Sequence, residues 1–244
     1  MKIAIFASGR GTNFQAITEH AKMQILRGAE VNLLITNDTK APVIKLAKEF
    51  DTPVIFLEGL QGRQFSTKQE REQARNEFDK RALESLRENK IDLVALAGFM
   101  QVLGNTLVHA YEYRIMNIHP AKDLAKFGGR GMYGERVHEA VIKAGAKESG
   151  CTVHYVDQSI DGGPIITQST VPVEPSDTPE SLAHRILIQE HRTYSKAIQL
   201  HVDGRIRIID GKAHIDWSRD WNEEWNRRQE AFIKYQEKTD ARRM

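Results

Sequence analysis

Cysteine is almost missing from the sequence, since Cys151 is the only one among 244 residues. One thiol cannot form an intramolecular disulfide, and it cannot build a cysteine-rich metal cluster. Long apolar stretches are also lacking near the N-terminus, where the run Ile3–Ala7 is too short for a signal peptide or a membrane span. We therefore expect a cytoplasmic protein that does not associate with membranes.

An excess of charge of one sign is lacking as well. The 35 basic residues face 33 acidic ones, and the net charge of +2 argues against a dedicated nucleic-acid surface. Hydrophobic residues make up 40% of the chain and charged residues 28%, which favours a packed core over wholesale disorder. The length fits one large domain, or one domain with an appendage.

The front half alternates short apolar runs with helical patterns. Apolar runs predict strands, and an i+4 apolar stripe predicts a long helix. The predicted strands are Lys2–Ala7, Glu30–Thr36, Pro53–Phe56 and Ile91–Ala97, the predicted shorter helices are Asn13–Ala21 and Ala41–Phe50, and the stripe is Ala74, Phe78, Ala82 and Leu86. This alternation predicts an α/β fold with a parallel sheet covered by helices on both faces, and ligands beyond the carboxyl ends of its strands.

The back half reads differently. The runs Cys151–Val156, Ile165–Val173 and Arg205–Ile209 resemble strands of a more antiparallel region, with a helix predicted over Thr178–Leu200. After about Trp217 the chain is rich in charge, and Trp217, Trp221 and Trp225 recur at i+4 spacing. We expect a main domain over residues 1–210 and a charged amphipathic helix within 211–244. Two interpretations of that helix are open. It packs on the body of the protein or on a partner chain, or it is a solvated helix with a frayed end.

A glycine-containing turn, Ser-Gly-Arg-Gly-Thr-Asn, occupies Ser8–Asn13 directly after the first predicted strand. Such a turn exposes backbone N–H groups at the positive end of the following helix, where phosphate is a natural guest. The turn is neither the dinucleotide fingerprint nor a P-loop. From these residues alone, a tight turn without a ligand is about as good an interpretation.

A polar pair ends the segment "RIMNIHP", which begins at Arg114. Side chains alternate across a strand, so Asn117 and His119 point to the same side. An amide and an imidazole there could polarise a carbonyl and move a proton, while the alternative is a hydrogen-bonded strand end. Asp161 precedes Gly-Gly-Pro at a turn. If its carboxylate lies beside His119, it would raise the pKa of the imidazole and favour the imidazolium.

A carboxylate interrupts the apolar stripe of the helix predicted over Thr178–Leu200. The stripe consists of Leu182, Ile186, Glu190 and Tyr194. A carboxylate on an apolar face needs a partner. Glu190 is therefore either half of an internal ion pair or a contact for the amine of a substrate.

Several motifs in order resemble one family, the folate-dependent formyltransferases of the phosphoribosylglycinamide branch. They are "ASGRGTNFQAI", "LAGFMQVL", "RIMNIHPA", "TVHYVDQSIDGGPII" and "IQEHRTY", and the likeness runs from Lys2 to about Ile209. The resemblance implies a Rossmann-like formyltransferase fold and the transfer of a formyl group from 10-formyltetrahydrofolate to an amine in purine biosynthesis. It implies no metal, small-molecule substrates, and a monomer or homodimer.

The same resemblance assigns roles to particular residues. Asn117, His119 and Asp161 would carry catalysis, and Glu190 would hold the amino end of the substrate. Substrate phosphate would bind at Gly11, Thr12 and Asn13. Folate would bind at Arg75, Met100, Gln101, Val102, Leu103, Asp157, Gln158, Ser159 and Ile160.

Two departures from the family pattern leave alternatives open. Lys122–Ala125 replaces a stiff apolar Leu-Leu-Pro segment beside the site, and Gln101 stands where arginine is frequent. A formyltetrahydrofolate deformylase, a formyltransferase acting on a sugar or on methionyl-tRNA, and a weak or silent phosphometabolite-binding protein are the rival hypotheses. The first of these rivals usually has an extra N-terminal domain, and the tRNA enzyme has a basic C-terminal one.

Overall fold

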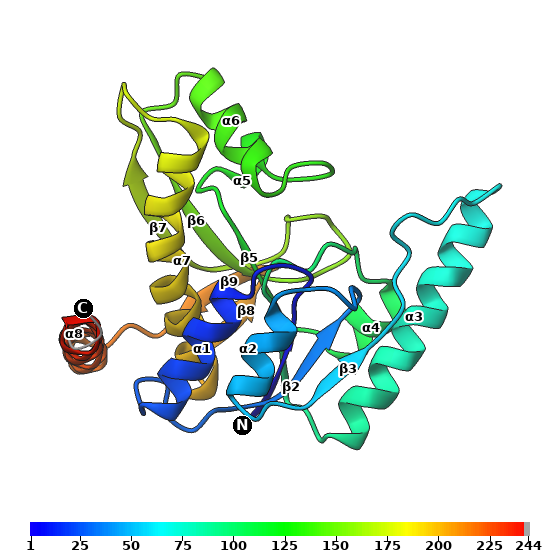
Figure 1. Cartoon of the computed structure of the whole chain (residues 1–244), viewed down its shortest axis with the longest axis horizontal. Helices are drawn as coiled ribbons and strands as arrows, with labels where there is room; N and C mark the ends of the chain where they lie inside the picture. Colours follow the sequence, from blue (N-terminus) through cyan, green and yellow to red (C-terminus); the bar gives the residue numbers. More distant parts are fainter. Residues whose placement is uncertain (242–244) are drawn as a thin grey trace.

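A computed structural model describes residues 1–241, with side chains up to residue 234, and places most strands in one seven-stranded sheet (Figure 1). The strand order is β3-β2-β1-β4-β5-β6-β7. The strands are β1 (Lys2–Phe6), β2 (Glu30–Thr36), β3 (Val54–Phe56), β4 (Leu93–Leu96), β5 (Ile115–His119), β6 (Glu148–Tyr155) and β7 (Ile165–Pro172). All pairs from β3 to β5 are parallel, whereas β5–β6 and β6–β7 are antiparallel. The predicted α/β class is confirmed.

Helices cover both faces of the sheet because the central strands are apolar on both sides. In β1, Ile3 and Ile5 belong to one buried cluster and Ala4 and Phe6 to the other, as the alternation of side chains requires. The first cluster is covered by α1 (Thr12–Lys22), α2 (Val43–Glu49), α6 (Glu135–Lys143) and α7 (Pro179–Val202), the second by α3 (Lys68–Glu88) and α4 (Asn105–Ala110).

The long helix α3 shows how the sequence pattern fixes the packing. Ala74, Phe78, Ala82 and Leu86, the predicted stripe, are all buried against the second cluster. Thr67 begins the helix, and its hydroxyl accepts a hydrogen bond from the backbone N–H of Glu70.

The chain changes direction through the sheet between β1 and β4. After β1 it continues into α1 on one face, and after β4 it continues into α4 on the other. The loops that follow the two strands meet, since the backbone N–H of Ser8 donates to the carbonyl of Gly98 (3.1 Å). Crevices at such switch points are the usual ligand sites of α/β sheets, so this edge positions the candidate site.

The C-terminal part was predicted only in outline. Arg205–Ile209 does contain a strand, β8 (Ile206–Ile209), but it pairs with β9 (Lys212–Ile215) in a separate two-stranded sheet. The sequence patterns did not identify β9, α4, α6 or α5 (Leu124–Phe127). The expected division at residue 210 falls in the turn of this hairpin and stays a prediction.

The charged tail forms α8 (Arg219–Ala241), which lies against the body of the protein (Figure 1). Trp221 and Trp225 are buried, but Trp217 is 47% exposed, so the predicted tryptophan stripe contributes only in part to the contact. No helix of the described chain combines the length and apolar character needed to cross a membrane.

Candidate active site

The predicted polar pair lies at the carboxyl end of β5. Met116 and Ile118 join the cluster beneath α1 and α7, and Asn117 and His119 therefore point the other way, as the alternation predicted. His119 is only 4% exposed. Both polar side chains are thus held on a central strand with little freedom to move.

Asp161 closes the cluster from the loop between β6 and β7. One of its carboxylate oxygens lies 3.4 Å from Nδ2 of Asn117, and the other lies 3.5 Å from Nδ1 of His119. The second oxygen also accepts a hydrogen bond from the backbone N–H of Gly129 (2.9 Å). The structure therefore brings Asn117, His119 and Asp161 together, although 42 residues separate His119 from Asp161 in the chain.

His154 is a further member of the cluster that the sequence analysis missed. It stands opposite Asn117 in the antiparallel pair β5–β6, and its Nε2 lies 3.2 Å from the Asn117 amide. Its Nδ1 contacts the carbonyl of Tyr155 (2.9 Å) and must donate there, which leaves Nε2 free to accept from Asn117. A buried polar residue on a predicted strand was the available signal, the same one that identified Asn117.

The segment that replaces the stiff apolar loop also reaches the cluster. Lys122 pairs with Glu148 (2.5 Å), and Asp123 caps the short helix α5 by accepting from the N–H of Lys126 (3.1 Å). At the end of α5, the carbonyl of Phe127 lies 2.7 Å from Nε2 of His119. The departing segment therefore leads into an ordered helix whose last residue contacts His119.

The protonation of His119 differs from the sequence-based expectation. Burial lowers the pKa of His119 below its usual range, and the opposing influences of Asp161 and the Phe127 carbonyl do not overcome this. The expected imidazolium is therefore wrong for the free protein. Nε2 donates to Phe127, so the neutral ring presents a lone pair at Nδ1 to Asp161, and a proton added there would make that contact attractive.

Asp161 itself stays ionised. Burial alone would raise the pKa of its carboxyl, but the nearby rings of His154 and His119 and the N–H of Gly129 together hold the pKa below its usual range. Asp161 also adopts a left-handed backbone conformation (φ 55°), which non-glycine residues seldom adopt. A strained, ionised carboxylate next to two imidazoles is typical of a site that handles protons.

The glycine-containing turn sits next to the switch point. Gly11 has φ 80° at the start of α1, and a Cβ there would lie 2.4 Å from Cγ2 of Val43, so glycine alone fits. No described side chain caps α1, so its first backbone N–H groups remain available to an anion.

Glu190 is paired with this turn across a long stretch of sequence. Its carboxylate accepts a hydrogen bond from Nδ2 of Asn13 (2.7 Å), and burial raises its pKa to about 7, against the lowering influence of Asn13 and Arg10. One turn further along α7, the hydroxyl of Tyr194 contacts the carbonyl oxygens of Leu96 (3.0 Å) and Met116 (2.9 Å). These contacts fix the helix that carries Glu190 to β4 and β5.

The residues predicted for folate lie in three places around the same edge. Met100–Leu103 follow β4, residues 157–160 follow β6, and Arg75 lies on α3. The first two loops share an apolar cluster through Leu103 and Val156, and Arg75 packs beside Gly104. Among the described residues, no single contact joins all three groups, and their binding role stays a prediction.

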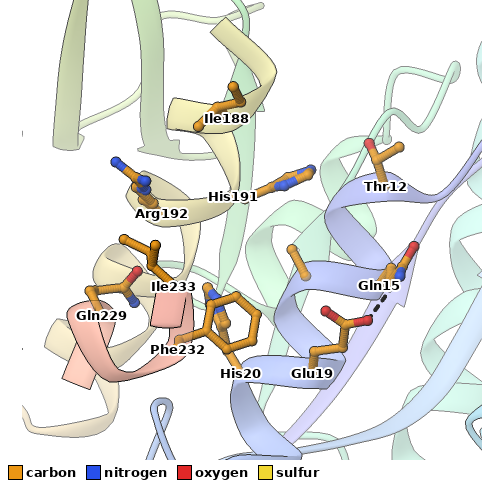
Figure 2. Close-up of a pocket in the computed structure, with 11 residues that line it drawn as sticks. Thr12, Gln15, Glu19, His20, Ile188, His191, Arg192, Gln229, Phe232 and Ile233 are labelled. Atoms are coloured by element: carbon orange, nitrogen blue, oxygen red, sulfur yellow. Dashed lines mark hydrogen bonds between the residues drawn. The ribbon is translucent and has the colours of Figure 1, made fainter. Parts of the chain in front are cut away.

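Two cavities lie elsewhere, between α7 and α8. The first has a volume of about 250 Å³ and extends from Thr12 in α1 to Phe232 in α8. Figure 2 shows the residues that line it. The second has a volume of about 380 Å³ and lies beside Lys196 and Trp225. The cluster of Asn117, His119 and Asp161 lines neither cavity. The chemical arrangement, rather than the cavities, therefore marks the candidate site.

Known proteins are similar to this chain in sequence. Residues 1–198 match the sequence profile described as formyl transferase. The chain is 38% identical over 205 residues to a chloroplastic phosphoribosylglycinamide formyltransferase of Vigna unguiculata, covering 84% of this chain and 62% of that protein. It is 37% identical over 198 residues to phosphoribosylglycinamide formyltransferase of Bacillus subtilis, covering 81% of this chain and 93% of that one.

A solved structure extends the likeness to three dimensions. Glycinamide ribonucleotide transformylase 1 of Symbiobacterium toebii superposes with a TM-score of 0.77 at 33% identity, covering 88% of this chain and 93% of that chain. The range matched by the profile, residues 1–198, includes the strand and loop that carry Asn117, His119 and Asp161. The chain belongs to the formyl transferase family.

Proposed function

We propose that this protein transfers the formyl group of 10-formyltetrahydrofolate to the amino group of 5'-phosphoribosylglycinamide, a step of purine biosynthesis. The single observation that carries the proposal is the convergence of Asn117, His119 and Asp161 at the carboxyl end of β5. The names of the relatives from Vigna unguiculata and Bacillus subtilis support it over a deformylase or a silent binding protein.

The reaction needs an amine to attack the formyl carbon, which places negative charge on the formyl oxygen. In our proposal, Nδ2 of Asn117 donates to that oxygen, a kind of contact whose loss costs about 3–4 kcal/mol in transition-state stabilisation. The proton that the attacking amine releases is held at Nδ1 of His119, where the ionised Asp161 at 3.5 Å stabilises the imidazolium, and it then moves to the departing folate nitrogen as the bond between that nitrogen and the formyl carbon breaks. His119 is thus neutral before the reaction and charged during it.

Asp161 has a second role in the proposal. The proton that leaves the attacking amine must reach the departing folate nitrogen. An ionised carboxylate between His119 and the N–H of Gly129 can order a water molecule along that route. Asp161 would therefore act both as a partner of His119 and as an organiser of the proton transfer.

The amine substrate would lie between α1 and α7. Its phosphate would accept from the backbone of Gly11, Thr12 and Asn13, and its amino end would face Glu190. A pKa of about 7 lets Glu190 accept a proton from an ammonium group near neutral pH, and an ammonium must lose a proton before it can attack.

The folate site fits an amphipathic ligand with a flat ring. Met100, Val102 and Ile160 are each 40% or more exposed, which leaves apolar surface available for contact with a ring. Arg75 has a buried Nε without a hydrogen-bond partner among the described residues, which suits an acidic ligand group. We assign Gln101, Leu103, Asp157, Gln158 and Ser159 to the same site by position.

A steady-state assay tests the proposal and separates its rivals. With both substrates, the absorbance change of folate release is expected, and it should depend on phosphoribosylglycinamide. An equal absorbance change without the amine would indicate a deformylase, and none at high enzyme concentration would indicate a silent homologue. The cytoplasmic location and the monomeric or dimeric state remain predictions, and sedimentation would test the latter.

A further inference from the structure

The C-terminal helix α8 lies outside the residues that match the family profile, yet it contacts both helices of the proposed amine site. Its buried face consists of Trp221, Trp225, Gln229 and Phe232, spaced four, four and three residues apart. This spacing places the four side chains on one side of the helix. The face covers α7 and the C-terminal half of α1, as Figure 2 shows for Gln229 and Phe232.

Two residues of α8 contact α1 or the turn that follows it, and one of them also contacts α7. The guanidinium of Arg228 donates to the carbonyl of Ile25, just after α1, and to the side-chain oxygen of Gln199 in α7 (2.8 and 3.3 Å). The rings of Phe232 and of His20 in α1 pack in a T-shaped arrangement with 4.4 Å between centroids. Each of these contacts ties α8 to the seam between the two helices.

His20 also contacts α7, and so links Phe232 to that helix. Its Nδ1 lies 2.7 Å from the hydroxyl of Ser195 in α7, and His20 is only 1% exposed. Among the hydrogen bonds of the described residues, two join side chains of α1 and α7 directly: His20 to Ser195, and Asn13 to Glu190. Phe232 packs over the first of these.

The second bond lies at the other end of the same helix pair. Asn13 and His20 are seven residues apart, about 10 Å along α1. α7 is fixed to the sheet by Tyr194, so a shift of α1 would move Asn13 relative to Glu190. The cavity of about 250 Å³ between the three helices runs from Phe232 to Thr12 and leaves room for such a shift.

From these contacts we infer that α8 positions the phosphate and amine contacts of the substrate site by holding α1 against α7. Phe232 and Arg228 are positioning residues, which act through His20 and the α1 backbone and do not touch the substrate. This inference rests on the proposed function, since it concerns the same substrate. According to this inference, α8 affects the binding of the phosphorylated amine. The folate site and the cluster at Asn117 do not depend on α8.

The test measures the two substrates separately in the full-length protein. Phe232→Ala should raise KM for phosphoribosylglycinamide by about fivefold or more, while kcat and KM for the folate change by less than about twofold. Calorimetric titration with phosphoribosylglycinamide should show the same loss of affinity. Phe232→Leu, which keeps an apolar contact with His20, should recover most of it. Arg227→Ala, on the exposed side of α8, should match the wild type.

Each other outcome has a definite meaning. A lowered melting temperature with unchanged KM for both substrates would mean that α8 only stabilises the fold, and the inference would be wrong. An equal rise of KM for the folate would overturn it as well. If Phe232→Ala does not fold, Arg228→Met, which removes the hydrogen bonds to Ile25 and Gln199 but keeps the bulk of the side chain, is judged by the same criteria. A wild-type protein that neither binds nor converts phosphoribosylglycinamide would refute the proposed function itself.

Discussion

Nε2 of His119 donates to the carbonyl oxygen of Phe127, 2.7 Å away at the end of the short helix α5. This bond fixes which ring nitrogen carries the proton in the neutral state, and it turns Nδ1 toward Asp161. The segment Lys122–Ala125, where the family usually has a stiff apolar loop, thereby takes part in orienting the proposed catalytic histidine.

Removing the cap of α5 should therefore impair catalysis. Asp123→Ala loses the hydrogen bond to the N–H of Lys126, at a cost of about 1 kcal/mol in stability, and frees the Phe127 carbonyl to move. We expect kcat to fall about tenfold. Thr67→Ala removes the matching cap of α3 and should cost similar stability without lowering kcat at saturating substrates. Equal kcat in both variants would mean that α5 does not orient His119.

The carboxylate of Asp161 should be essential for turnover but not for folding. Asn keeps the shape of the side chain and tolerates the left-handed backbone, but it cannot stabilise an imidazolium as a carboxylate does. We expect Asp161→Asn to lower kcat by about 10²- to 10⁴-fold while its circular dichroism stays native. Asp51, exposed and also left-handed (φ 57°), gives the matched control Asp51→Asn. Near-normal turnover of Asp161→Asn would remove Asp161 from the catalytic set.

Glu190 should destabilise the protein at alkaline pH. Its pKa is about 7 in the folded state against an ordinary value of 4.5, so its contribution is fully favourable below pH 4.5 and is lost as pH rises through 7. The free energy of unfolding of Glu190→Gln, measured with urea, should rise relative to that of the wild type by up to about 3 kcal/mol between pH 4.5 and pH 8.5. Exposed Glu49 provides the control Glu49→Gln, and parallel stability curves for Glu190→Gln and wild type would contradict the prediction.

His20 should make the protein sensitive to acid. Burial, with His191 and Arg192 nearby, lowers its pKa from 6.5 to about 4, so the stability it contributes is present above pH 6.5 and is lost as pH falls through 4. His20→Gln should start less stable at pH 7, since it disturbs the contacts with Ser195 and Phe232. On acidification, the free energy of unfolding of this variant should fall by about 3 kcal/mol less than that of the wild type. His109→Gln, at an exposed site, should follow the wild-type curve, and an unchanged slope for His20→Gln would rule His20 out as a cause of acid sensitivity.

Local patterns alone determined much of this protein. Apolar runs and the i+4 stripe from Ala74 to Leu86 predicted the layered α/β architecture, because alternation and helical periodicity depend only on neighbours in the chain. The period of two along β5 was sufficient to place Asn117 and His119 on one side of the sheet. The resemblance of the quoted motifs supplied the roles that spacing could not.

Tertiary structure decided what depends on distant parts of the chain. The antiparallel register of β5 and β6 brought His154 to Asn117, and the packing of α1 on α7 paired Asn13 with Glu190, 177 residues away. Burial reversed the expected shift of the His119 pKa, because desolvation outweighed the nearby carboxylate. The packing of α8 on the body likewise depends on the surface that it meets. The spacing of tryptophans and charges along the tail does not specify that surface.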